Sequence, residues 1–271
     1  MRIVTLVEDT TKNPDIKAEH GLSLYIETAG HVLLADTGAG GIILDNAKRL
    51  GIDLGRVDTV IISHGHYDHA GGLMAYAGEY QGADIYMNKR ALGDYYHGER
   101  YIGIDKRIAG LPGLVMVEND DRYDIDDELS LFAGISGRRL WPAGNLLLSE
   151  RIDGKTVQDE FRHEQCLVIR ENNKYTLVSG CAHNGVLNIL SRFRSIYGVY
   201  PDNVISGFHM MKAGAFTEAE RAYIYHTAEE LNTYDARFIT GHCTNNEAYE
   251  LMKSVMGDKL QHFSSGCEII L

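Results

Sequence analysis

The sequence predicts a layered α/β sandwich in which two β-sheets pack together and helices cover their outer faces. In both halves of the chain, apolar strand-like runs end in polar loops that lead into amphipathic helices. The 271 residues, 44% hydrophobic and 24% charged, have the composition of an ordinary globular protein. Short-period repeats and low-complexity linkers are absent from the sequence, so we expect a single domain over 1–271.

In the first half, short runs rich in Val, Ile, Leu and Tyr are separated by turn residues, which is typical of strands. Ile43, Ala47 and Leu50 share one helical face, so a helix is expected from Gly41 to Leu50. The expected strands are Ile3–Val7, Leu22–Glu27, His31–Ala35 and Val57–Ile62.

The middle of the chain, about 88–154, has scattered aromatic residues, glycines and charges. Strands are expected there at Leu114–Glu118 and Leu129–Ala133, and the turn Trp141-Pro142-Ala143-Gly144 has the composition of a lid. We therefore predict that this segment is an insertion lying over the functional site.

The second half repeats the order of strand, polar loop and helix. Glu171-Asn172-Asn173-Lys174 predicts a hairpin turn, and Thr217 with Glu220 predicts a capping box. The expected strands are Cys166–Arg170, Tyr175–Ser179, Val204–Ser206, Phe238–Thr240 and Glu268–Leu271. The expected helices run from about Val186 to Tyr197, Thr217 to Leu231 and Glu247 to Met256.

Charge and composition restrict the partners. A formal net charge of −12 opposes nucleic acid or an anionic membrane as the main partner, because both require a basic surface. The sequence has no apolar run of the ~20 residues that a membrane span needs. Its start does not resemble a signal peptide, and its four cysteines form no CxxC pair, so a reducing cytoplasm is expected. No motif indicates a particular oligomeric state.

A dense cluster of metal-binding residue types follows the strand expected at Val57–Ile62. His64, His66, Asp68 and His69 lie within six residues, and imidazole and carboxylate are common ligands of transition metals. Residues two apart in extended backbone point to the same side, so His64 and His66 can grip one ion. Asp68 and His69 follow at a turn and can face a second ion, whereas a solvated polar loop rarely has this composition.

Three further histidines follow strands in the second half and are candidates to complete the centre. His183 and His242 are predicted as additional metal ligands, and His209 has the same context. Each of them taken alone is equally consistent with a hydrogen-bonded structural histidine, but their shared placement favours function. The histidines without this context, interpreted as surface or packing residues, are His20, His31, His97, His163, His226 and His262.

Cys181 and Cys243 adjoin two of these histidines. Either thiolate could bind a soft metal, but a small buried packing residue is the favoured interpretation. Asp36 ends a strand and is either a carboxylate that orients a metal-binding histidine or a turn cap, and both interpretations stay open.

These motifs resemble those of the metallo-β-lactamase superfamily. His64 to His69 match its HxHxDH signature, and a narrower resemblance links the chain to the dihydropterin-synthase-like branch. The segments that carry this narrower resemblance are Glu19–Ser23, Ser63–Leu73, Gly180–Gly185, Gly207–Met210 and Gly241–Thr244.

The resemblance implies an αββα four-layer sandwich with metals at one edge between the sheets. The chain departs from the family pattern at one position. Many members carry a metal-bridging aspartate where this chain has Cys181, in the segment Gly180-Cys181-Ala182-His183. Di-iron redox members carry a carboxylate at the position of His66, so the histidine here favours the hydrolase pattern.

The predicted function is a metal-dependent hydrolase that uses a mono- or dinuclear centre to activate water against a small anionic substrate, with a phosphorylated one preferred. Asp68 is expected to bind metal and hold the nucleophile, and His209 to act as general acid or substrate donor. Two zinc ions are favoured, with manganese, iron or magnesium as alternatives. The alternative functions are a pterin-type synthase that performs metal-assisted condensation and, less favoured, a non-catalytic metal-binding module.

Arginines in the middle segment are candidates for binding a substrate phosphate, because guanidinium grips phosphate through a planar fork of donors. Arg138 and Arg139 are predicted to bind substrate, and Arg107 lies in the same segment. Solvated surface charge is the equally weighted alternative for these residues.

Overall fold

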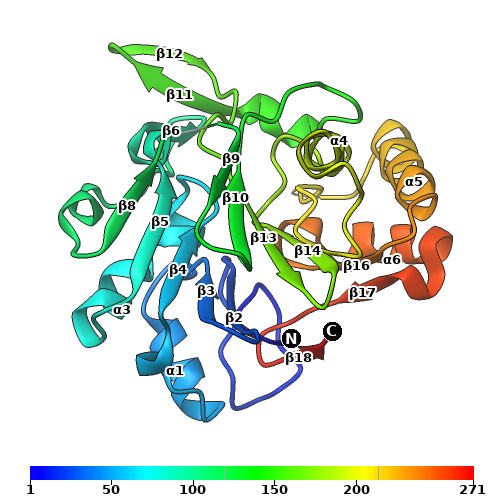
Figure 1. The fold of residues 1–271 in the computed structure, drawn as a ribbon. Helices are drawn as coiled ribbons and strands as arrows, with labels where there is room; N and C mark the ends of the chain where they lie inside the picture. The colour runs from blue at the N-terminus through cyan, green and yellow to red at the C-terminus, as the bar shows by residue number, and fades with distance from the viewer. Residues whose placement is uncertain (119, 213) are drawn as a thin grey trace.

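Two seven-stranded sheets pack face to face, and helices cover the outer face of each (Figure 1). The computed structural model describes residues 1–118, 120–212 and 214–271. This arrangement is the αββα sandwich that the sequence predicts.

The first sheet has the strand order β18-β1-β2-β3-β4-β5-β8. The pairs from β18 to β3 are antiparallel, and those from β3 to β8 are parallel. The bounds of these strands are β1 Arg2–Val7, β2 Ser23–Glu27, β3 Val32–Ala35, β4 Thr59–Ile62, β5 Asp84–Asn88, β8 Leu114–Val117 and β18 Glu268–Ile270.

The second sheet has the order β17-β16-β15-β14-β13-β10-β9 and repeats the same change of direction. Its pairs from β9 to β14 are antiparallel, and those from β14 to β17 are parallel. The bounds are β9 Arg122–Asp124, β10 Leu129–Phe132, β13 Cys166–Glu171, β14 Lys174–Ser179, β15 Asn203–Ser206, β16 Arg237–Thr240 and β17 Leu260–His262. Each half supplies most of one sheet, with β9 and β10 joining the second sheet and β18 returning to the first.

Alternation along the strands builds separate cores on the two faces of each sheet. In β2, Leu24 and Ile26 point into the core between the sheets, whereas Tyr25 packs under the helices of the first layer. In β4, Ile61 points inward, and Val60 and Ile62 point outward. The strands are apolar on both faces because both faces are covered.

The four helices expected near 41–50, 186–197, 217–231 and 247–256 are present close to those bounds, whereas the short helices α2 and α3 were not predicted. The capping box of Thr217 and Glu220 begins α5, and Asn172 and Asn173 have the positive φ angles that their tight hairpin turn requires. The α-helices are α1 Ile42–Arg49, α2 Tyr67–Ala70, α3 Leu73–Glu79, α4 Val186–Tyr197, α5 Glu218–Asn232 and α6 Asn246–Met256. The 3₁₀ turns are η1 Leu54–Arg56, η2 Lys89–Leu92, η3 Lys106–Gly110, η4 Ala143–Leu147, η5 His242–Thr244 and η6 Gly257–Lys259.

The segment 88–154 is not one continuous insertion. Its strands β8, β9 and β10 complete the two main sheets, because their apolar residues pack in the shared cores. Only a small third sheet of order β12-β11-β6-β7 stands apart, at the top of Figure 1. Its strands are β6 Asp94–His97, β7 Arg100–Tyr101, β11 Leu148–Ile152 and β12 Lys155–Gln158. Residue 119 of the predicted insertion lies outside the described part.

The parallel strands of both sheets direct the predicted ligands to one edge of the sandwich. His64 follows β4, and in the second sheet His183, His209 and His242 follow β14, β15 and β16. Loops at the carboxyl ends of parallel strands meet at one edge, so residues far apart in sequence come together there.

In the described part of the chain, every helix is too short or too polar to cross a membrane.

Candidate metal centre

One group of donors is built by three histidines. His64, His66 and His183 are buried, and one ligand atom of each lies within 4.8 Å of the others. His64 Nε2 and His183 Nε2 are 3.3 Å apart. The opposite ring nitrogens are held in place, because His64 Nδ1 lies 2.8 Å from Ser63 Oγ and His183 Nδ1 lies 3.1 Å from Asn145 Oδ1.

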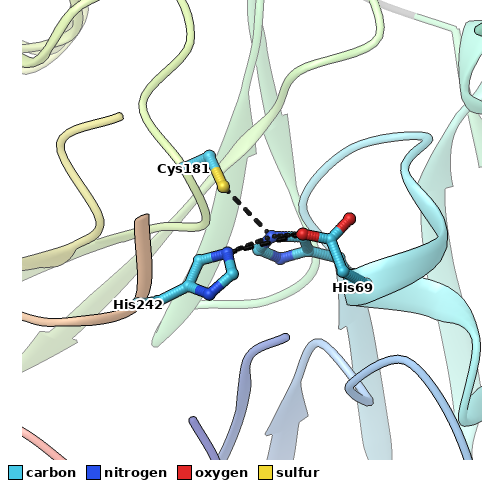
Figure 2. Close-up of side chains that lie close together, drawn as sticks. His69, Cys181 and His242 are labelled. Atoms are coloured by element: carbon cyan, nitrogen blue, oxygen red, sulfur yellow. Dashed lines mark hydrogen bonds and ion pairs between the residues drawn. The ribbon is translucent and has the colours of Figure 1, made fainter. Parts of the chain in front are cut away.

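A second group of donors lies beside the first and contains Asp68, His69, His242 and Cys181. Figure 2 labels the last three of these. His69 Nε2 lies 3.2 Å from His242 Nε2 and 3.1 Å from Cys181 Sγ. Asp68 Oδ2 is 3.6 Å from the same His69 nitrogen and 3.5 Å from His242 Nε2. Four donor atoms of three chemical kinds thus converge on one point.

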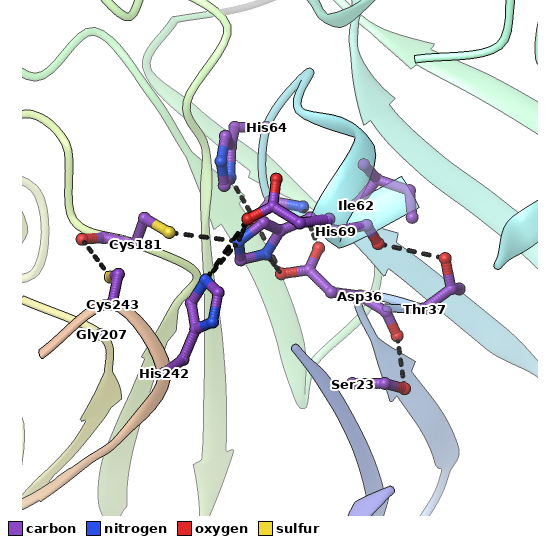
Figure 3. Close-up of polar contacts among 12 residues, drawn as sticks. Ser23, Asp36, Thr37, Ile62, His64, His69, Cys181, Gly207, His242 and Cys243 are labelled. Carbon is purple, nitrogen blue, oxygen red and sulfur yellow. Dashed lines mark hydrogen bonds and ion pairs between the residues drawn. The ribbon is translucent and has the colours of Figure 1, made fainter. Parts of the chain in front are cut away.

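The carboxylates of Asp36 and Asp9 orient the histidines of this second group, and Figure 3 shows Asp36 beside His69. Asp36 Oδ2 lies 2.6 Å from His69 Nδ1, while Asp36 Oδ1 accepts a hydrogen bond of 2.7 Å from the Ser63 N–H. Asp9 Oδ1 lies 2.6 Å from His242 Nδ1. Carboxylates in this position fix the tautomer that leaves Nε2 free to bind metal. Asp36 therefore orients a histidine rather than only capping a turn.

The donor spacing fits a tetrahedral metal ion. Two nitrogens bound to zinc at ~2.0–2.1 Å with tetrahedral angles lie ~3.3 Å apart. The facing Nε2 atoms of His64 and His183 are 3.3 Å apart, and those of His69 and His242 are 3.2 Å apart. Neutral nitrogens this close direct lone pairs at each other, which is unfavourable unless a proton or cation lies between them. The residues present therefore fit two adjacent metal ions.

Burial prepares the three-histidine group for metal. Desolvation lowers the pKa of His64 and His183 well below the ordinary value, and neighbouring histidines lower it further. Desolvation, with His163 adding to it, lowers the pKa of His66 to about 3. Because metal binds the neutral imidazole, these rings need not lose a proton before they coordinate.

In the second group, neighbouring charges favour the charged forms of His242 and Asp68, whereas burial favours the neutral histidines of the first group. Burial opposes the charged form of His242, but hydrogen bonds with Asp68 and Asp9 outweigh it and raise its pKa well above the ordinary value. Burial would raise the pKa of Asp68, yet the neighbouring His69 and His242 hold it well below its usual range. A metal entering here would therefore compete with a proton on His242.

Several loops of the centre have unusual backbone conformations. Asp36, Ala182, His209 and His242 have φ angles of 60°, 52°, 49° and 51°. Non-glycine residues rarely adopt positive φ, and such strain is found where surrounding structure over-determines it, often at functional sites.

A cavity of about 380 Å³ opens over both donor groups. His209 lines it, with its ring centroid 4.2 Å from that of His183, and its buried Nδ1 has no hydrogen-bond partner among the described residues. The His209 N–H donates to Cys243 Sγ at 3.2 Å. Cys243 is not among the donor groups found in the described residues, which agrees with the packing interpretation. Cys181 does belong to a donor group, which agrees with the alternative that its thiolate binds metal.

Sequence reasoning overlooked several residues that support the centre. Asp159 Oδ2 lies 3.1 Å from His163 Nε2, and His163 Nδ1 accepts a hydrogen bond from the Gly65 N–H. Glu164 accepts a hydrogen bond of 2.7 Å from the backbone of His183. His20, which the sequence pattern indicates as a surface or packing residue, lines the cavity, and its Nε2 lies 3.4 Å from Asp68 Oδ2. These residues follow no periodic pattern, so spacing alone did not single them out.

The predicted substrate-binding arginines lie elsewhere. Arg138 forms an ion pair with Glu160 and covers the Trp141 ring, and Arg139 forms an ion pair with Glu230. Both are exposed and neither lines the cavity above the donors. The prediction that they bind substrate is not supported by this placement, because their segment runs toward α4 and α5 instead of covering the metal centre.

Comparison with known proteins decides the family. The model of the metallo-β-lactamase superfamily matches residues 16–139. The chain is 30% identical to Tm1679, described as a metal-dependent hydrolase of the β-lactamase superfamily, with a TM-score of 0.84 over 100% of this chain and 99% of that one. The chain belongs to the metallo-β-lactamase superfamily. Within the superfamily signature, His64 and His66 lie in the first donor group, and Asp68 and His69 lie in the second.

Two relatives from Methanocaldococcus jannaschii match nearly the whole chain, and the name of one of them agrees with the narrower resemblance. One is named 7,8-dihydropterin-6-methyl-4-(β-D-ribofuranosyl)-aminobenzene-5′-phosphate synthase and is 27% identical over 300 residues, covering 98% of this chain and 95% of the relative. The other, an uncharacterized protein, is 26% identical over 251 residues, covering 91% of this chain and 92% of the relative.

The fold alone is shared more widely. Zn²⁺-bound PqqB from Methylobacterium extorquens has a TM-score of 0.62 over 100% of both chains at 12% identity.

Proposed function

We propose that this protein is a metal-dependent hydrolase that directs water onto an electrophilic carbon or phosphorus of a small anionic substrate. The observation that supports this most is the pair of adjacent donor groups beneath an open cavity. His64, His66 and His183 would hold one ion, and Asp68, His69, His242 and Cys181 the other. Such ions supply Lewis acidity and make hydroxide available near neutral pH.

The residues of the chain perform the remaining tasks. Asp68 reaches toward the cavity from the second group and holds the attacking water by accepting its hydrogen bond. His209 stands on the cavity wall with a ring nitrogen that no described residue occupies, so it donates a proton to the leaving group. The buried walls around the histidines exclude bulk water and strengthen these interactions.

A test combines metal content with turnover. The purified protein is analysed for bound elements and assayed with a panel of phosphoesters, lactones and thioesters. We expect about two ions per chain with zinc as the preferred ion, and Asp68→Asn should lower kcat by at least ~10²-fold. His226→Ala, which removes an exposed histidine outside the centre, is the matched control. A protein that binds metal yet accelerates none of these reactions would contradict the proposal.

A pterin-type synthase is the second candidate. It is favoured by the relative named as a synthase, which aligns with 98% of this chain. The same donor groups would then assist condensation of a phosphorylated precursor. Product analysis separates the two functions, because hydrolysis incorporates an oxygen from labelled water into the product, whereas condensation joins two substrates.

A further inference from the structure

The cavity above the donor groups has two basic side chains of the Arg and Lys type on its wall. Among the described residues that line it, these are Arg100 and Lys212. Lys212 is already engaged, because its Nζ lies 2.8 Å from both carboxylate oxygens of Glu220. Its charge is therefore largely neutralised within the protein.

Of the two basic side chains that line the cavity, Arg100 is the one that has no carboxylate partner among the described residues. Across residues 1–118, 120–212 and 214–271, no acidic side chain forms an ion pair with it. It donates a hydrogen bond of 2.8 Å to Tyr67 Oη, which uses one of five guanidinium N–H groups. In a chain of net charge −12, a cavity arginine that keeps its remaining donors available is suited to an anion from solution.

The metal-binding motif itself positions Arg100. Tyr67 lies between His66 and Asp68, and its N–H donates a 2.9 Å hydrogen bond to the carbonyl of Ile102 at the end of the β7 hairpin. The Arg100 guanidinium carbon also lies 5.0 Å from the centroid of the Tyr67 ring. Tyr67 thus holds both the backbone of this hairpin at Ile102 and the side chain of Arg100. The guanidinium is therefore preorganised relative to the two groups of metal donors.

Part of the cavity wall is apolar. Ile102 from the β7 hairpin, Leu147 and Leu148 around η4, and Met211 after β15 line it. Leu147 is anchored to the same hairpin, because its carbonyl accepts a hydrogen bond from the Gly98 N–H. Such a wall accommodates a hydrocarbon or aromatic body better than a bare inorganic ion.

We propose that Arg100 recognises the anionic group of the substrate, and that the substrate is an organic phosphate or carboxylate with an apolar body. Its anion lies at the β7 rim, and its reacting bond faces the two donor groups. This inference rests on the proposed function and moves the anion-binding role from Arg138 and Arg139, which lie outside the cavity, to a residue that lines it.

The kinetic test compares an anionic ester with a neutral ester of the same leaving group, using metal-loaded protein. For Arg100→Gln we expect the ratio of kcat/KM for the anionic ester to that for the neutral ester to fall about 10- to 100-fold, mainly through KM. Arg100→Lys should lose less, and metal content should stay unchanged in both variants. Arg138→Gln is the matched control and should leave the ratio unchanged.

A binding measurement keeps the inference separate from the proposed function. Calorimetric titration with phenylphosphonate, whose P–C bond is not hydrolysed, measures affinity whether or not the protein hydrolyses esters. We expect the Kd of Arg100→Gln to rise about 10-fold or more relative to the unaltered protein, and Arg138→Gln to match the unaltered protein. Equal Kd values for the unaltered protein and Arg100→Gln, or a selective loss in Arg138→Gln, would overturn the assignment. Absent hydrolysis with the expected binding difference would overturn only the hydrolase proposal.

Discussion

Asp9 Oδ1 lies 2.6 Å from Nδ1 of His242, although the two residues are 233 positions apart in the sequence. Asp9 follows β1 of the first sheet, and His242 follows β16 of the second. The contact therefore crosses the interface between the sheets at the edge where the donors meet. It links the integrity of the sandwich to the orientation of a metal ligand.

This contact predicts that Asp9→Ala weakens metal binding at the second donor group. Losing a carboxylate that orients a histidine typically costs 10- to 100-fold in metal affinity or activity. Competition with a chromophoric chelator measures the affinity, and Asp45→Ala, which removes an exposed aspartate, is the control. Asp9 Oδ2 also lies 2.8 Å from His20 Nδ1. An equal loss of affinity in His20→Ala would show that the effect does not act through His242.

Cys181 is predicted to be a ligand, since its Sγ lies 3.1 Å from His69 Nε2. A thiolate bound to Co²⁺ gives a charge-transfer absorption that nitrogen and oxygen ligands lack. We expect the cobalt-loaded protein to show this band and Cys181→Ser to lose it, while Cys267→Ser, remote from the centre, retains it. Persistence of the band in Cys181→Ser would place the sulfur ligand elsewhere, and Cys243→Ser would then be examined.

The two donor groups should differ in the pH dependence of metal binding. The pKa values of His64, His66 and His183 are lowered by burial, so these rings are already neutral between pH 6 and 8. The pKa of His242 is raised well above its ordinary value, and burial, together with Cys243, raises the pKa of the Cys181 thiol. Binding at the second group must therefore displace protons.

Because protons and metal compete there, affinity for the second ion should rise with pH, up to about tenfold per unit for each proton released. Affinity for the first ion should change little over the same interval. Calorimetry in buffers of different ionisation enthalpy counts the protons released in each step. Equal proton release for both ions would contradict the assigned charge states.

Gly65 is predicted to be intolerant of a side chain. A Cβ there would lie 2.4 Å from the Ala91 carbonyl oxygen and 2.8 Å from the Tyr95 ring, so backbone between His64 and His66 would have to move. Gly65→Ala should lower the free energy of unfolding of the metal-free protein by about 1–3 kcal/mol. Gly78 lies in α3 with no atom within 4 Å of its Cβ position, so Gly78→Ala should add about 0.5–1 kcal/mol. Denaturant unfolding measures the free energy of unfolding of both variants. An equal change in Gly65→Ala and Gly78→Ala would contradict the steric explanation.

Local patterns in the sequence predicted most helices and the strands that carry the ligands. Apolar periodicity located α4 over Val186–Tyr197, and alternation with turn residues located β1 and the β13–β14 hairpin. The strand β5 was not predicted, because its Asp84–Asn88 run is short and has polar residues at both ends. The strands of the third sheet were also missed, because their polar, partly exposed residues follow no clear alternation.

The division of the centre into two groups shows where sequence information ends. By itself the sequence determined that His64, His66, Asp68 and His69 form a compact donor cluster, because neighbouring residues cannot separate and their alternation follows from backbone geometry. Only the tertiary structure decided that Cys181 and Asp9 join this centre, that Arg138 and Arg139 do not, and that Arg100 lines the cavity. Those positions depend on strand register and on packing between the two sheets, which bring together residues from distant parts of the chain.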